Sequence, residues 1–134
     1  MVYITRNQII AINANITGAH GHSIINAGAL DEAINAPARV IMGHEMNKLL
    51  GEKAAALVMP IAQAHPFQDG NKRTAAQALV QFLAINGYTI IQGRENFVND
   101  LIGRCADALP ITKEDLAARL QMQIIKIGAT FVNI

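Results

Sequence analysis

A short polar stretch between two apolar helical segments constrains this chain more than any other feature. Residues 51–64 and 71–86 each predict one helix, because alanine and larger aliphatic residues recur there at helical spacing. Between them the chain reads His-Pro-Phe-Gln-Asp-Gly-Asn-Lys-Arg-Thr-Ala, from His65 to Ala75. These residues predict a loop that leads into a helix N-terminus. Unpaired backbone N–H groups and the positive end of the helix dipole meet there, which suits a bound phosphate.

The length and composition predict one folded domain that spans residues 1–134. A chain of 134 residues suits a single hydrophobic core, and two domains would each be undersized. Hydrophobic residues make up 51% of the chain and charged residues 16%, which excludes an intrinsically disordered protein. Aromatic residues contribute only 4%, so the core must consist mainly of aliphatic side chains.

The charge and the cysteine content restrict the class of protein further. The formal net charge is +1, without a long run of one sign, so no nucleic-acid-binding surface is expected. Cys105 is the only cysteine, which excludes an internal disulfide and favours a reducing compartment; its apolar neighbours predict a buried thiol. No segment approaches the roughly 18 apolar residues of a membrane span, and no signal peptide follows Arg6. We therefore expect a soluble cytoplasmic protein without a membrane partner.

Helix signals along the whole chain predict an all-α fold. Thr5 and Gln8 form a capping box, which begins a helix that ends near residues 17–18. Further helices are expected at residues 29–35, 39–50, 52–64, 71–86 and 95–109, and the last one begins at the Thr112 cap and runs toward Ile125 or beyond. The sum is a compact single-domain bundle of about six helices.

Smaller signals interrupt this helical pattern. Residues 24–25 and 88–91 predict brief extended segments, and Pro60 should kink its helix or mark an irregular turn. The glycines of residues 18–23 predict a loop. His20 and His22 lie in this loop without a further metal ligand nearby, so we interpret them as loop residues.

His65 and Asp69 are the candidates for proton transfer and metal binding in the polar stretch. An imidazole titrates near neutral pH and can accept the proton of a hydroxyl group. Mg²⁺ prefers carboxylate oxygen, so Asp69 would hold a magnesium ion that bridges phosphate oxygens. Each residue also has a structural alternative: His65 could cap the end of the first flanking helix, and Asp69 could cap the start of the second.

The four residues that follow Asp69 are candidates for binding phosphate. Gly70 allows a close approach of the backbone or a positive φ, and Asn71 can direct its amide at a phosphate oxygen or cap the helix. Lys72 and Arg73 place two cations at a helix N-terminus, where they oppose the helix dipole. Only a negative ligand justifies that placement, so the pair favours a bound phosphate.

The string from His65 to Arg73 resembles the signature of the Fic/Doc family, H-P-F-x-D/E-G-N-G/K-R. Residues 28–39 resemble a second segment of the family, and the order of the expected helices agrees, so the resemblance covers most of the chain. It implies a Fic/Doc-like helical fold that uses ATP and Mg²⁺. The implied catalytic residues are His65, Asp69, Asn71, Lys72 and Arg73; the implied nucleotide-binding residues are Gly70, Asn71, Lys72 and Arg73, with Asp69 as the metal ligand.

Two departures from the adenylyltransferase pattern make the chain similar to the Doc branch. Lys72 replaces a second glycine, and Ala76 replaces a second arginine. The resemblance then implies an inverted ATP whose γ-phosphate is transferred to a threonine hydroxyl of elongation factor Tu, which blocks translation. This is the activity of a toxin from a toxin–antitoxin module. Two alternatives stay open: AMP transfer on the same fold, and a non-catalytic module that uses the fold only to bind a partner.

The resemblance also implies a partner. Family members that silence themselves carry an inhibitory helix with the pattern S/T-x-x-x-E-G/N. Glu95 and Asn96 fit its end, but Ile91 stands where the hydroxyl residue is required. Restraint is therefore expected from a Phd-like antitoxin that docks an amphipathic helix in a groove between helices. Residues 18–27 fall where the family has a flap that positions its protein target, although a plain connecting loop is an equal alternative.

Overall fold

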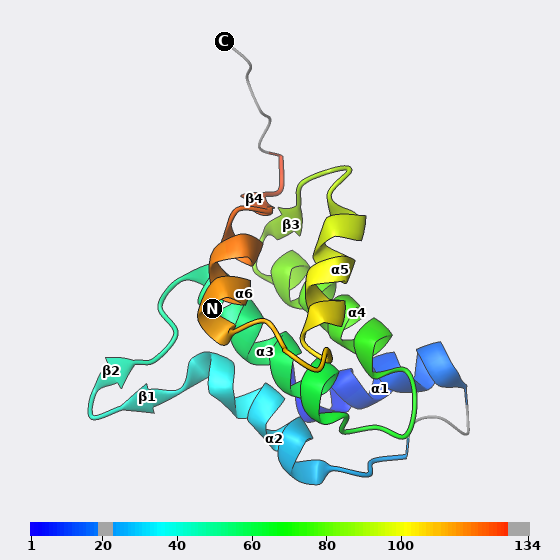
Figure 1. Ribbon diagram of the computed structural model, residues 1–134. Coiled ribbons are helices and arrows are strands. Elements are labelled where there is room, and N and C mark those ends of the chain that lie inside the picture. Colours follow the sequence, from blue (N-terminus) through cyan, green and yellow to red (C-terminus); the bar gives the residue numbers. More distant parts are fainter. Residues whose placement is uncertain (19–22, 129–134) are drawn as a thin grey trace.

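The helix α3, Leu50–Ala64, runs through the middle of the molecule and organises the other helices around it (Figure 1). The computed structural model describes residues 1–18 and 23–128. Within them, α3 contacts α2, α4, α5 and α6. Its sequence explains this central position, because alanine, leucine, valine and isoleucine cover nearly its whole circumference, and such a helix must be surrounded by others.

Six α-helices make up most of the described chain, which confirms the expected all-α fold. They are α1 (Arg6–Thr17), α2 (Ala27–Asn35), α3 (Leu50–Ala64), α4 (Asn71–Ile85), α5 (Glu95–Arg104) and α6 (Lys113–Gln121). All six contribute to one hydrophobic core. A short 3₁₀ helix, η1 (Ala36–Ala38), follows α2. No helix in the described residues is long and apolar enough to cross a membrane.

Several local signals have the predicted effect. The Thr5 side chain accepts a hydrogen bond from the Gln8 backbone, and the Gln8 side chain accepts one from the Thr5 backbone. The Thr112 hydroxyl caps α6 by accepting a hydrogen bond from the Asp115 N–H. Cys105 is buried as expected, and its burial raises the pKa of the thiol to about 11. Helix α3 continues without interruption through Pro60 to its last residue.

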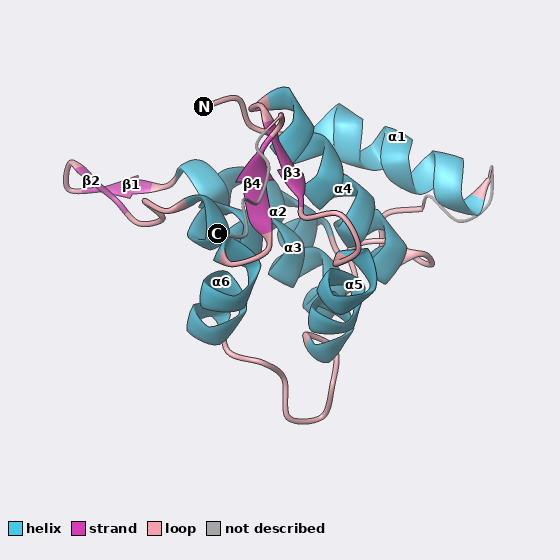
Figure 2. Ribbon diagram, turned by 90° about the horizontal axis from the view of Figure 1, so that it is seen from above, coloured by secondary structure: helices cyan, strands magenta, loops and turns pink. Residues whose placement is uncertain are grey.

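The prediction of a helix at residues 39–50 is wrong. The chain forms a hairpin there, with β1 (Val40–Ile41) antiparallel to β2 (His44–Glu45). Met42 and Gly43 both have positive φ, 50° and 81°, as a tight hairpin turn requires. Figure 2 shows this hairpin projecting away from the helices. Its apolar side chains remain exposed to solvent.

The predicted ends of two other helices are also wrong. Helix α5 ends at Arg104 instead of residue 109, and tight turns occupy the residues before Pro110. Helix α6 ends at Gln121, and Ile124–Lys126 forms strand β4, antiparallel to β3 (Tyr88–Ile90). The expected strand at residues 88–91 therefore exists as β3. Because Ile124–Lys126 pairs with this strand, these residues do not continue α6. Long-range pairing outweighs local helix propensity at this position.

Gly51 determines how closely α6 can approach α3. A Cβ atom at Gly51 would collide with the backbone of Ala117 and with Gln121, neither of which can move freely. We therefore expect Gly51→Ala to lower the free energy of unfolding by about 1–3 kcal/mol. Gly103, in α5, is the matched control, because a Cβ there meets nothing within 4 Å. Gly103→Ala should raise stability by up to about 1 kcal/mol. Urea unfolding of both variants measures the contrast, and equal effects would contradict the proposed packing.

Candidate active site

The polar stretch forms the connection between α3 and α4. Helix α3 ends at Ala64, and His65 follows in the left-handed conformation, with φ 51° and ψ 72°. This conformation is uncommon for a residue with a side chain, and it turns the chain sharply at the imidazole. The chain then passes through Gly70, which is also left-handed with φ 72°, and α4 begins at Asn71. Two sharp turns therefore bracket the loop.

Phe67 and Asn71 fix the loop from the inside. Phe67 is completely buried in the hydrophobic core. The Asn71 side chain accepts a hydrogen bond from the Phe67 N–H at 2.9 Å and donates one to the Phe67 carbonyl at 2.8 Å. From the sequence, this amide was expected to bind a phosphate oxygen or to cap the helix. In the structure it closes the loop instead, which leaves the backbone N–H of Asn71 as its group for an anion.

Residues 23–26 hold the loop from one side. Ile24 forms an antiparallel bridge with Phe67, and the Ile25 and Asn26 N–H groups both donate to the Pro66 carbonyl, at 2.8 and 3.1 Å. The expected extended segment at residues 24–25 is therefore present. These residues belong to the segment that was interpreted as a flap or a connecting loop. Residues 19–22, with His20 and His22, lie outside the described residues.

Helix α1 holds the loop from the other side through a residue that sequence reasoning missed. The completely buried Asn13 side chain donates to the Asp69 carbonyl at 2.9 Å and to the Thr74 hydroxyl at 3.0 Å. A usable signal did exist in the sequence. Asn13 is a polar residue beside Ile12 and four residues after Ile9, on the face of α1 that is otherwise apolar.

The first turn of α4 presents three backbone N–H groups without acceptors. The first hydrogen bond inside the helix runs from the Thr74 N–H to the Gly70 carbonyl. In the described part of the chain, the N–H groups of Asn71, Lys72 and Arg73 donate no hydrogen bond. The helix dipole adds positive potential at the same place. This turn can therefore bind an anion through its backbone alone.

The predicted site residues gather around this turn. A shallow hollow of about 330 Å³ is lined by His65, Gln68, Asp69, Gly70, Asn71, Lys72 and Arg73. His65, Asp69, Lys72 and Arg73 are all exposed to solvent. The Asp69 carboxylate accepts the Gly70 N–H at 2.8 Å, and Lys72 and Arg73 make no ion pair with another described residue. The hollow therefore combines a base, a carboxylate and free cations.

Asp69 suits a metal ion whose other ligands come largely from a bound substrate. The described residues contain no cluster of three or more histidine, cysteine, aspartate or glutamate side chains. Mg²⁺ is often bound through only one or two carboxylates, with phosphate oxygens and water completing its coordination. A single carboxylate beside an anion-binding turn suits that mode of binding.

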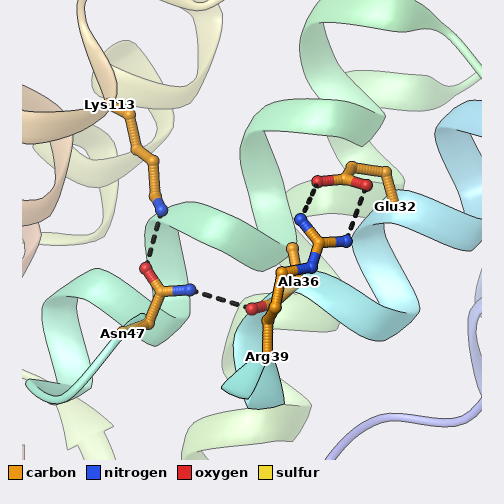
Figure 3. Close-up of polar contacts among 5 residues, drawn as sticks. All are labelled: Glu32, Ala36, Arg39, Asn47 and Lys113. Atoms are coloured by element: carbon orange, nitrogen blue, oxygen red, sulfur yellow. Dashed lines mark hydrogen bonds and ion pairs between the residues drawn. The ribbon is translucent and has the colours of Figure 1, made fainter. Parts of the chain in front are cut away.

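A larger hollow, of about 510 Å³, lies elsewhere, against α2, α3 and the β1–β2 hairpin. Small and apolar side chains line much of it, among them Ala29, Ala55, Ala56, Met59 and Pro60. Figure 3 shows its polar edge, where Arg39 forms a two-point ion pair with Glu32 and Lys113 donates to Asn47. The hydrogen bond from Arg39 lowers the pKa of the Glu32 carboxyl.

This larger hollow, called the α2–α3 groove below, suits binding better than chemistry. Its charged side chains are held in hydrogen bonds, and none of the described residues that line it is a histidine or a cysteine. It reaches the neighbourhood of the polar loop through Asn26, Gln63 and Ala64. The hollow around His65 is smaller, but of these two hollows, as far as the described residues show, it is the one that combines an imidazole, a carboxylate and an anion-binding helix start.

Comparisons with known proteins match this chain to a family and to a relative. The model of the Fic/DOC family matches residues 3–83, a range that runs from the start of the chain through most of α4. The protein named Toxin Doc from Mycolicibacterium smegmatis (strain ATCC 700084 / mc(2)155) is 31% identical over 117 residues. That alignment covers 84% of this chain and 89% of the relative. The family match includes the polar loop, Asn13 and the N-terminus of α4.

Proposed function

The chain belongs to the Fic/DOC family, and we propose that it is a toxin that transfers the γ-phosphate of ATP to a threonine hydroxyl of a protein. The expected target is elongation factor Tu, whose modification would block translation in the cytoplasm. One observation carries the proposal: His65 and Asp69 line the same hollow as the unpaired N–H groups at the start of α4.

Each residue has a role that follows from its chemistry. The N–H groups of α4 and the two cations, Lys72 and Arg73, bind and orient the phosphates. Asp69 would hold Mg²⁺, which when bound neutralises part of the charge on the phosphate oxygens. The His65 imidazole takes the proton from the threonine hydroxyl. The threonine oxygen then bonds to the γ-phosphorus, and the bond from that phosphorus to the bridging oxygen breaks, so that ADP leaves with the electron pair.

Two positions favour γ-phosphate transfer over AMP transfer. Lys72 adds a bulky cation at the narrow turn, where an adenylyltransferase would have glycine. Ala76, one turn further along α4, provides no second guanidinium for the outer phosphates. Lys72 narrows the turn where the inner phosphates of ATP would sit, and the absence of a second arginine at position 76 weakens the grip on the outer phosphates. AMP transfer on the same site remains the alternative.

Labelled ATP separates these two reactions. Incubation of the protein and elongation factor Tu with ATP labelled at the γ-phosphate should label the target, and ATP labelled at the α-phosphate should not. Mass spectrometry of the target checks the same outcome, since a phosphate and an adenylate add different masses. Label from the α-position alone would establish AMP transfer.

Growth assays test whether the protein acts by catalysis or by binding. Expression of the unmodified chain should arrest growth, and His65→Ala should relieve the arrest, because loss of a general base reduces rates by about 10²–10⁴-fold. The control is His44→Ala, which removes an exposed histidine of the hairpin that does not line the hollow around His65. Equal toxicity of the His65 and His44 variants would favour a non-catalytic binding module.

The same proposal includes an antitoxin that restrains the protein. Its amphipathic helix would occupy the α2–α3 groove, where Ile41 and Met46 at the hairpin side are each about half exposed, at 49% and 50%. Lys113 at the edge donates only to the neutral Asn47 amide among the described residues, so it can pair with a carboxylate of the partner. An occupant of this groove would end beside His65.

A charge introduced in the groove tests this docking. Met46→Asp should leave toxicity unchanged and reduce rescue by a co-expressed antitoxin, because it buries a carboxylate against an apolar helix. Met122→Asp is the control, since Met122 is 75% exposed and lies outside the groove. Binding measured by calorimetry should weaken at least about tenfold for Met46→Asp, a loss of about 1.4 kcal/mol. Undiminished binding would exclude the groove as the docking site.

A further inference from the structure

Asn13 is a polar side chain in a place where packing alone would select an apolar one. It lies on the buried face of α1 with Ile9 and Ile12, and its exposed fraction is 0%. A buried amide without hydrogen bonds is costly, so the bonds that Asn13 does make must offset its burial. Those bonds lead directly to the candidate active site.

The Asn13 amide spans the anion-binding turn. Its Nδ2 donates to the carbonyl of Asp69, just before the turn, and to the hydroxyl of Thr74, just after it. The intervening residues, 70–73, include the three unpaired N–H groups. One side chain from α1 therefore connects the two ends of the turn across 56 and 61 positions of sequence.

Only the donor end of this amide is used. Within the described residues, Asn13 Oδ1 is buried and has no hydrogen-bond partner. Leaving that acceptor unpaired is unfavourable. The burial of Asn13 is thus offset by the hydrogen bonds from its side-chain N–H groups to the Asp69 carbonyl and the Thr74 hydroxyl. Its side-chain oxygen contributes no such bond within the described residues.

The end of α1 also packs directly on the turn. A Cβ atom at Gly70 would lie 2.6 Å from the Thr17 methyl group and 3.4 Å from an Ile16 methyl group. The Thr17 hydroxyl in turn donates to the Asn13 carbonyl at 2.8 Å. Helix α1 therefore lies directly against the turn.

We propose that Asn13 is a positioning residue, which fixes the Asp69–Arg73 turn so that its N–H groups and the Asp69 carboxylate face one phosphate site. The nature of the ligand rests on the function proposed above, whereas the positioning of the turn does not. Loss of the Asn13 donor should loosen the turn and weaken nucleotide binding, while the rest of the fold persists.

Amide hydrogen exchange tests the positioning without any ligand. The Phe67 and Thr74 N–H groups, which are bonded inside the loop and across the turn, should exchange about tenfold faster in Asn13→Ala, relative to the Leu83 amide in the same helix. The matched control is Asn15→Ala, an exposed asparagine of α1. An unchanged exchange ratio in Asn13→Ala would overturn the proposal.

Affinity for ATP with Mg²⁺ separates positioning from general stability. We expect the Kd of Asn13→Ala to rise about tenfold. Ile9→Val, which removes one methylene from the same face of α1, lowers stability but should leave the Kd within about twofold. Equal Kd values for the Asn13 and Ile9 variants would overturn the role. If the unmodified protein binds no ATP, the proposed function fails, and the exchange ratio still decides the role of Asn13.

Two substitutions of Thr74 test whether its hydroxyl is the acceptor that Asn13 needs. Thr74→Ser keeps the hydroxyl and should retain the affinity of the unmodified protein, whereas Thr74→Val removes one of the two acceptors and should weaken binding. The double variant Asn13→Ala/Thr74→Val should bind no more weakly than Asn13→Ala alone, because the two changes remove the same hydrogen bond. Additive losses would show that the residues act separately, contrary to the proposal.

Discussion

At the start of α4, three backbone N–H groups that find no acceptor in the described residues lie beside two exposed cations. This concentration of positive charge is unfavourable until an anion neutralises it. The apolar packing of α4 holds the arrangement in place, because Thr74, Ala75 and Ala78 are buried in the same helix. The fold thus stabilises a helix whose first turn would be costly in isolation. The binding energy of a phosphate can then be used to orient the ligand, since no protein group needs to be displaced.

Most of the remaining architecture keeps that turn in one position. Asn71 closes the loop on Phe67, residues 23–26 pair along one side, and Asn13 bonds across the other. These contacts join parts of the chain that are far apart in sequence. The geometry of the site is therefore a property of the complete core, and His65 reaches its left-handed conformation only because α3 and α4 are held by their neighbours.

Most features that depend on neighbouring residues could be predicted from the sequence, and most that depend on distant residues could not. The exceptions are the local β1–β2 hairpin, which was expected as a helix, and strand β3, which was expected although its partner is distant. The Thr5 and Thr112 caps and the polar loop are encoded within a few positions, so their local chemistry was sufficient. Strand β4 exists because β3 offers a partner some 36 positions away, as the pairing of Tyr88 with Lys126 and of Ile90 with Ile124 shows. Asn13 was missed for the same reason, since its hydrogen-bond partners lie far along the chain. Only its polarity on an apolar helix face indicated a special role.

The position of the α2–α3 groove relative to His65 would connect the proposed activity with its proposed restraint. Both features depend on α3: Met59 and Pro60 line the groove, and the chain reaches His65 immediately after Ala64, where the groove ends. The Asn26 side chain, which borders the groove, donates to the Ala64 carbonyl, and its N–H donates to Pro66 inside the loop. A partner in the groove would thus press on residues that hold the loop around His65. Inhibition would then need no inhibitory segment in this chain, because the last turn of α3 already links the two surfaces.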